Sequence, residues 1–387
     1  MNSTNNWLIK KLFYIFWAIL LLQHPIVSLA QQDSSFIRNI AALPKIKKLT
    51  IPSRNGFIIL PIISRSIETS WAFGVATSVT LKHRYADSLS RTSNVQSILL
   101  YSLRKQMVAA INGTIYFPHE KYILNGQLSL SSFPDKFWGV GQIASANKEE
   151  AYTFKQYYIY AHLQRRIRPN LYIGSLYEFQ NVFEINYEKN GLFDQQMVTG
   201  RNAYKTSGLG GSLTWDTRNH AFTPGKGLLL QYRMNHFGQY LGSDYSYTSF
   251  VLDTRKFFTT FKNQVLALQA FGSFNAGKQV PLRSLSSLGG ANSMRGYYNG
   301  RFRDKNQIVF QAEYRAPIYG RFGLVAFGST GEVSPSLSKF SVDNFKFSYG
   351  MGARFTLSKK ENLNLRIDYG ITQNKESGFY IQLGEAF

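Results

Sequence analysis

Apolar side chains recur at every second residue through most of the chain. The run Leu363–Tyr369 has the sequence LNLRIDY, Leu228–Asn235 has LLLQYRMN, and Ile308–Arg315 has IVFQAEYR. Successive side chains of a β-strand point to opposite faces of the sheet, so each run predicts a strand with one apolar and one polar face. Aromatic residues make up 15% of the chain, and they too favour strands.

Two kinds of fold accommodate such strands. In a soluble sandwich the apolar face packs on a second sheet, whereas in a membrane barrel it contacts lipid and the polar face lines the lumen. Charged residues such as Arg366 and Asp368 recur on the polar face of strands whose other face is almost wholly apolar. Aromatics also lie near many strand ends, as membrane girdles require. The pattern therefore favours an all-β fold, a transmembrane antiparallel β-barrel.

The chain contains about sixteen such runs, an even number that is typical of bacterial barrels. Both termini of the chain then face the periplasm, and short inner turns alternate with longer outer loops. The predicted inner turns include Pro317–Arg321 and Ser358–Glu361. The long outer loops are predicted at Phe133–Ala151, Gln180–Ser207, Pro281–Asn306 and Gly331–Asn344. The predicted strands are Gly56–Ser64, Ser70–Lys82, Asn94–Arg104, Val108–Phe117, Tyr122–Ser132, Tyr152–Arg165, Leu171–Glu178, Gly208–Asp216, Gly227–His236, Tyr245–Phe257, Val265–Phe274, Gln307–Ala316, Phe322–Ser329, Phe345–Leu357, Asn362–Gly370 and Gly378–Phe387.

The N-terminal residues carry the features of an export signal. Lys10 and Lys11 precede the apolar run Leu12–Leu22, and Ser28-Leu29-Ala30 supplies small residues before a cleavage site. An uncleaved anchor helix is the alternative. We therefore predict three segments: a cleaved signal peptide at residues 1–30, a short periplasmic tail at residues 31–55 and the barrel at residues 56–387.

The charge balance is strongly basic, with 44 Lys and Arg against 22 Asp and Glu. The basic residues are scattered through strands and connections, and the export signal directs the chain out of the cell, so nucleic acid is not an expected partner. The anionic head groups of outer-membrane lipid and lipopolysaccharide are the natural ones. The chain has no Cys, which excludes a disulfide framework and a thiolate metal site.

One connection is unusually long and unusual in composition. Leu288–Asp304 has the sequence LGGANSMRGYYNGRFRD and lies between two predicted strands. A hairpin loop usually needs only about 2–5 residues. Loops this long are either functional or disordered, and the closely spaced glycines and aromatics indicate an ordered one.

The segment Ser293–Tyr297, SMRGY, resembles the sixth outer loop of the outer-membrane assembly-factor superfamily, the surface-antigen barrels of BamA/TamA type. That family carries an aliphatic-Arg-Gly-aromatic motif, usually after a Gly-Gly pair. Here the motif residues are Met294, Arg295, Gly296 and Tyr297, and the pair is Gly289-Gly290. The loop falls between the eleventh and twelfth predicted strands, as it does in the family. Phe133–Gly141 and Gly208–Gly227 are similar to family segments too.

The resemblance implies that this loop folds into the lumen and that Arg295 contacts acidic residues on the twelfth and thirteenth strands. Glu313 matches the twelfth-strand partner and alternates onto the lumen face. The thirteenth-strand pattern Phe-x-Asp-x-Gly appears here as Phe327–Gly331, with Ser329 in place of the Asp. A buried cation must be paired, and the planar fork of Arg suits carboxylates, so Glu313 is the expected clamp.

The segments before and at the end of the predicted barrel can also be compared with the family. Family members that insert or secrete proteins carry periplasmic POTRA domains, and the segment 31–55 is too short for one. Periplasmic or outer-membrane partner proteins are therefore expected to supply that function. The terminal Phe387 follows an alternating run and resembles the recognition signal of outer-membrane barrels, although Glu385 stands where an apolar residue is usual.

The sequence offers no catalytic constellation. The His residues have no ligand-type spacing, and no G-x-S-x-G elbow occurs. We therefore expect neither an enzyme nor a cofactor or metal. The resemblance implies a role in inserting or translocating proteins or lipids at the outer membrane. The alternative is a pore or transporter that kept the scaffold without the assembly role.

Overall fold

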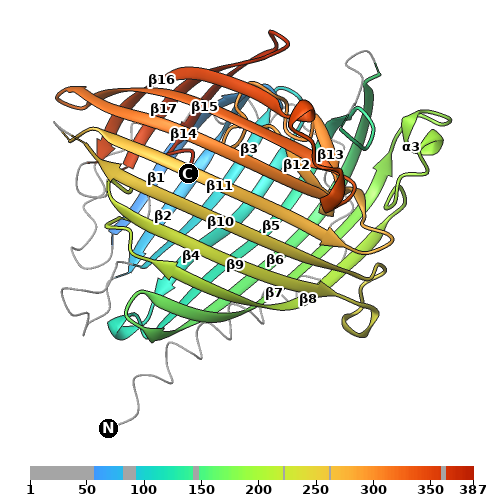
Figure 1. Ribbon diagram of the computed structural model, residues 1–387, viewed down its shortest axis with the longest axis horizontal. Helices are drawn as coiled ribbons and strands as arrows, with labels where there is room; N and C mark the ends of the chain where they lie inside the picture. Colours follow the sequence, from blue (N-terminus) through green and yellow to red (C-terminus); the bar gives the residue numbers. More distant parts are fainter. Residues whose placement is uncertain (1–55, 82–92, 143–147, 221–222, 261–262, 359–362) are drawn as a thin grey trace, which may run out of the picture. The chain divides into compact units, whose positions relative to one another are not determined.

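The computed structural model describes residues 56–81, 93–142, 148–220, 223–260, 263–358 and 363–387. Residues 53–387 form one compact unit. Within it, sixteen strands form one antiparallel sheet that closes into a barrel (Figure 1). The predicted signal peptide and periplasmic tail lie outside the described residues.

The barrel strands follow one another around the wall in chain order, except that β11 pairs with β14 because β12 and β13 form a separate hairpin. The strands are β1 (Gly56–Ser66), β2 (Ser70–Leu81), β3 (Ser93–Ser102), β4 (Met107–Tyr116), β5 (Tyr122–Phe137), β6 (Glu150–Arg168), β7 (Leu171–Asn186), β8 (Tyr204–Asp216), β9 (Gly227–Phe237), β10 (Tyr247–Thr259), β11 (Val265–Ala276), β12 (Ser286–Leu288), β13 (Phe302–Asp304), β14 (Asn306–Tyr319), β15 (Phe322–Ser334), β16 (Lys346–Ser358), β17 (Leu363–Thr372) and β18 (Ser377–Leu383). The helices are short: α3 (Leu192–Gln195) and the 3-10 turns η1 (Pro118–Glu120), η2 (Gln239–Leu241), η4 (Leu282–Ser284), η5 (Leu337–Lys339) and η6 (Val342–Asn344).

The predicted barrel of about sixteen strands is confirmed, and each predicted run overlaps one barrel strand. Some observed strand ends differ from the predicted ones, because the alternation of apolar and polar residues does not mark where a strand ends. β5 and β7 extend five and eight residues beyond their predicted ends, to Phe137 and Asn186. They continue past the apolar stretch because hairpin pairing, and not lipid contact, holds these outer parts. The last strand ends at Leu383, so the predicted extension to Phe387 is wrong.

Burial alternates along the strands as the period-two pattern requires. On β17, Arg366 and Asp368 are 1% and 0% exposed, whereas Ile367 and Tyr369 are 37% and 44% exposed. The apolar face therefore points outward and the charged face into the barrel. No helix among the described residues is long and apolar enough to cross a membrane.

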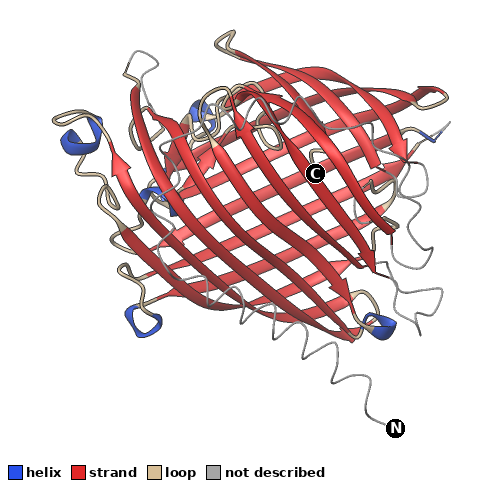
Figure 2. Cartoon of the chain, turned by 180° about the vertical axis from the view of Figure 1, so that it is seen from behind, coloured by secondary structure: helices blue, strands red, loops and turns tan. Residues whose placement is uncertain are grey.

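The loops gather at the two ends of the barrel (Figure 2). We call the end that carries the 277–305 connection the outer end and the opposite one the inner end. At the outer end, a hydrophobic cluster joins strand ends to loops. Its buried members are Phe137, Tyr152, Phe154, Val182, Phe193, Val198, Tyr204 and Leu282. They come from β5 to β8, from α3 and the segment that follows it, and from the turn η4, so this cluster packs the loops onto the outer ends of those strands.

Candidate functional site

The connection between β11 and β14, residues 277–305, is loop six, and it has an apolar core of its own. Leu288, Met294, Tyr297 and Phe302 are buried against the wall residues Val309 and Val333. The hairpin β12–β13 and two backbone hydrogen bonds close the loop. The Gly290 N–H donates to the Tyr297 carbonyl, and the Gly300 N–H donates to the Leu288 carbonyl. Loop six is therefore a packed structure inside the barrel.

Three glycines of the motif region adopt backbone conformations that other residues rarely reach. Gly289, Gly290 and Gly296 have φ values of 109°, 106° and 114°. A Cβ on Gly289 would collide with the Tyr298 carbonyl oxygen. The Gly-Gly pair and the Gly of the Arg-Gly-aromatic motif are therefore required by backbone geometry.

Arg295 lies at the centre of the site and is 1% exposed. Its Nη2 donates to Glu313 Oε2 over 2.6 Å, and its Nη1 donates to Asp368 Oδ2 over 2.5 Å. Its guanidinium lies 3.5 Å from the centroid of the Phe327 ring. Two carboxylates and a stacked ring satisfy a cation that burial would otherwise penalise by several kcal/mol.

The ion pairs continue beyond Arg295 into a network. Arg315 Nε donates to the second oxygen of Glu313 over 2.7 Å. Arg354 donates to Asp368 Oδ1 over 2.5 Å and to Glu385 Oε2 over 2.8 Å. Cations and carboxylates thus alternate, and each carboxylate bridges at least two guanidinium groups. Removing one member leaves its neighbours partly paired.

The residues of the sequence-predicted clamp are placed differently. Glu313 contacts Arg295, but Ser329 does not: its hydroxyl pairs with the Ser348 hydroxyl at 2.8 Å. Asp368 on β17 provides the second carboxylate, and sequence analysis missed it. The family pattern directs attention to β15, whereas Asp368 lies two strands further around the barrel.

Glycines on β16 and β17 make room for this second carboxylate and for the loop. Gly352 is paired with Asp368, and a Cβ there would collide with the Asp368 carboxylate. A Cβ on Gly370 would lie 2.5 Å from the Arg295 carbonyl oxygen. The lumen-facing glycines of these strands, next to a lumen-facing Asp, are the sequence signal that could have identified the site.

A second anchor holds loop six near the outer end of β5. The Asp135 carboxylate accepts hydrogen bonds from the hydroxyls of Tyr152 and Tyr298 over 2.9 and 3.0 Å. It also pairs with Arg303 and Arg283, at 3.3 and 3.4 Å. Asp135 belongs to the Phe133–Gly141 segment, whose Gly141 N–H donates to the Arg303 carbonyl over 2.8 Å. This segment and loop six are thus bound to each other.

The geometry shows a structural site, in which buried ion pairs hold loop six to the barrel wall. The described residues contain no group of three or more His, Asp or Glu that could hold a metal ion. Residues 99–387 match the model of the Omp85 superfamily domain. This chain belongs to the Omp85 superfamily. Omp85 proteins are outer-membrane barrels that assemble or translocate proteins and are not enzymes.

Solved Omp85-type barrels share the fold. BamA from Haemophilus ducreyi lacking POTRA domains 1-3 matches with a TM-score of 0.55 and 13% identity, over 86% of this chain and 70% of that one. CdiB from Acinetobacter baumannii matches with a TM-score of 0.53 and 12% identity, over 86% and 60%. CdiB from Escherichia coli matches with a TM-score of 0.54 and 11% identity, over 89% and 63%. The chain thus spans less than two thirds of either CdiB chain. No curated protein sequence matches it.

The last residues of this Omp85 chain leave the wall and pack in its lumen. The chain turns at Gly384, whose φ is 84°, and Phe387 then packs with Phe257 and Ala267 of β10 and β11. Arg315 Nη2 donates to the Phe387 carbonyl oxygen over 3.0 Å. Phe387 is therefore part of an inner cluster next to the ion network, and not the end of an outward-facing strand.

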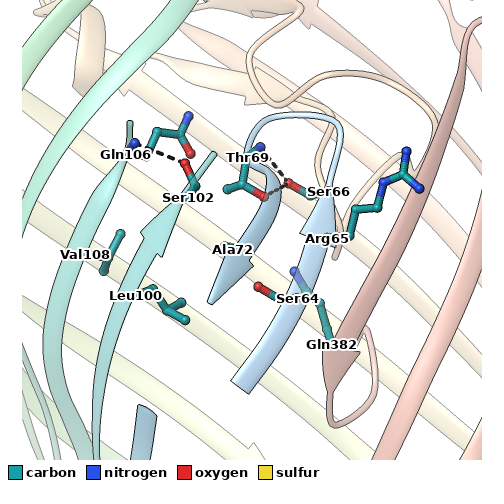
Figure 3. Close-up of a pocket in the computed structure, with 10 residues that line it drawn as sticks. All are labelled: Ser64, Arg65, Ser66, Thr69, Ala72, Leu100, Ser102, Gln106, Val108 and Gln382. Atoms are coloured by element: carbon teal, nitrogen blue, oxygen red, sulfur yellow. Dashed lines mark hydrogen bonds between the residues drawn. The ribbon is translucent and has the colours of Figure 1, made fainter. Parts of the chain in front are cut away.

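The barrel closes between β1 and β18 at a short seam. The pairing of these strands consists, among the described residues, of one residue pair, Arg65 opposite Ile381. A cavity of about 130 Å³ lies beside the seam. Figure 3 shows its lining, which includes the small side chains of Ser64 and Ala72 and larger ones such as Gln382.

Proposed function

We propose that this Omp85 barrel inserts or translocates proteins, or lipids, at the outer membrane through the seam between β1 and β18. The supporting observation is the single Arg65–Ile381 pair of the seam, since β1 is paired with β2 along its whole length, Gly56–Ser66. Unpaired backbone groups at a sheet edge are a template for another strand. A weakly paired seam can therefore open and accept the strand of a client.

Packing at the outer end of the barrel favours a route through the seam over a route along the lumen. The hydrophobic cluster described above packs α3 and η4 onto the outer ends of β5–β8, and loop six packs against β14 and β15. Both occupy space that an open channel would need. The cavity of about 130 Å³ beside the seam, in contrast, leaves room for incoming side chains.

Depletion of the protein, followed by a census of outer-membrane proteins, tests the assembly role. We expect some barrels to decrease in abundance, and an unchanged census would contradict the proposal. A disulfide between Arg65→Cys and Ile381→Cys would lock the seam, and the absence of native Cys makes this variant clean. The locked protein should fail to rescue depletion until it is reduced. The matched control is Val75→Cys with Leu99→Cys, an opposed pair on β2 and β3.

A pore or transporter is the second candidate, and one observation favours it. A polar cavity of about 360 Å³ lies in the lumen, lined by residues such as Gln127, Ser129 and Ser249. Planar-bilayer conductance separates the two functions. Large, stable channels would favour the pore, whereas small or absent conductance is expected from the closed outer end.

Partner proteins and lipopolysaccharide belong to the proposal as well. The outward-facing apolar surface contacts lipid, and a client-delivering chain in the periplasm would bring substrates to the seam. Affinity purification from the outer membrane checks this, and recovery of the barrel alone would count against a stable partner.

A further inference from the structure

Loop six donates one backbone hydrogen bond to each side of the seam. The Gly296 N–H donates to the Tyr380 hydroxyl of β18 over 3.0 Å. The Asn299 N–H donates to Glu68 Oε1 over 2.8 Å. Glu68 lies in the turn that joins β1 to β2. Two groups only three residues apart in loop six thus reach β18 on one side of the closure and the β1–β2 turn on the other.

Both acceptors are held in place. Tyr380 is fully buried. The turn that carries Glu68 is fixed by Gln106, whose Nε2 donates to the Glu68 carbonyl over 3.1 Å and to the Pro134 carbonyl over 3.0 Å. Gln106 and the neighbouring turn residues Ser66 and Thr69 are drawn in Figure 3. The Tyr380 side chain and the backbone of the Glu68 turn are therefore both held in place.

The donors lie close to Arg295 in the chain, since Gly296 follows it directly and Asn299 is four residues after it. Arg295 is clamped to β14 through Glu313 and to β17 through Asp368. The absence of a side chain at Gly370 allows the backbone of residues 295 and 296 to lie against β17. The clamp therefore sets the position from which Gly296 and Asn299 reach the seam.

From this geometry we infer that loop six is a latch across the seam, so that its displacement frees β1 and β18 together. The strands of the seam share a single residue pair and a cation–π contact of Arg65 with Phe379. The two hydrogen bonds from loop six are therefore a substantial part of what holds the seam. The biological use of the latch rests on the proposed function. Opening of the latch can be measured without any client protein. The latch and the proposed function can therefore be tested, and can fail, independently of each other.

The test measures seam opening with spin labels. Ile63→Cys on β1 and Leu383→Cys on β18 carry the labels, since both side chains are exposed on the outer surface and the chain has no other Cys. Pulsed dipolar spectroscopy of the purified full-length protein in lipid vesicles gives the distance distribution. The latch variants are Tyr380→Phe, which removes one oxygen atom, and the double variant Tyr380→Phe with Glu68→Ala.

We expect Tyr380→Phe to raise the population of long label distances about fivefold, the effect of one lost hydrogen bond, and the double variant to raise it further. Tyr297→Phe is the matched control. It also removes one hydroxyl, which donates to the Phe347 carbonyl on β16 over 3.3 Å, away from the seam. Its distances should stay unchanged.

Heat-modifiable mobility on gels verifies that each variant is folded. Unchanged distances in folded Tyr380→Phe would overturn the latch, and so would an equal shift in Tyr297→Phe, because that shift indicates general loosening of the loop. A seam that opens in the variants without any change in the outer-membrane census would uphold the latch and count against the proposed function.

Discussion

Arg295 and Asp368 are 73 residues apart in the sequence, yet their guanidinium and carboxylate meet over 2.5 Å inside the barrel. Arg295 lies on loop six between β11 and β14, and Asp368 lies on β17. The pair exists because the wall curves, which brings the lumen faces of β14 and β17 to two sides of one guanidinium. Four predictions follow from this pair and from the contacts around it.

Arg295→Ala should destabilise the folded barrel by about 3 kcal/mol, the lower end for breaking a buried ion pair. The cost stays at that end because Arg315 and Arg354 still pair with the two carboxylates. Urea unfolding in vesicles and heat-modifiable mobility measure it. Arg295→Lys should lie between wild type and Ala, since a point charge cannot bind both carboxylates in a planar fork. Unaltered mobility of Arg295→Ala would rule out the structural role.

Asp368→Asn and Ser329→Ala should differ clearly in stability. The Asp368 variant leaves Arg295 and Arg354 short of one buried carboxylate, at a cost of about 3 kcal/mol. The Ser329 variant loses one hydroxyl contact with Ser348, worth about 1 kcal/mol. The same unfolding assay compares them. If Ser329→Ala proved the more damaging change, the second carboxylate of the clamp would be wrongly assigned.

Asp135→Asn should loosen loop six and the Phe133–Gly141 segment while leaving the barrel folded. A neutral amide cannot offset the charges of Arg283 and Arg303. We expect faster tryptic cleavage of loop six in the purified protein. Asp343→Asn is the control, since it makes the same change at an exposed position in η6. Equal cleavage rates in the two variants would contradict the second anchor.

The latch should be tighter at acidic pH. Burial raises the pKa of Glu68 above its usual value, and hydrogen bonds from Ser66 and Asn299 oppose this only in part. A raised pKa in the latched state means that protonation favours that state, so its stability is present at low pH and lost as the pH rises through the raised pKa. The spin-label distances should therefore shorten on acidification in wild type. Glu68→Gln, which cannot titrate, should show no such dependence.

Much of the fold could be predicted because alternation is a local property. A strand such as β17 shows its two faces in LNLRIDY without reference to any other strand. Sixteen such runs, with charge on one face and apolar residues on the other, leave few solutions other than a barrel. The Arg-Gly-aromatic motif likewise identifies loop six, since its glycines are required by local backbone angles.

The partners across the lumen were decided by the tertiary structure alone. The second carboxylate for Arg295 comes from Asp368 and not from the position of Ser329, and Phe387 packs inward instead of ending a strand. The alternation of a single strand indicates only that a side chain faces inward. Which inward-facing groups meet depends on strand register, on wall curvature and on the space that Gly352 and Gly370 leave. Residues distant in sequence determine the register, the curvature and this space jointly. The sequence alone therefore determines the strands of this protein, whereas only the closed barrel determines its clamp, its latch and its seam.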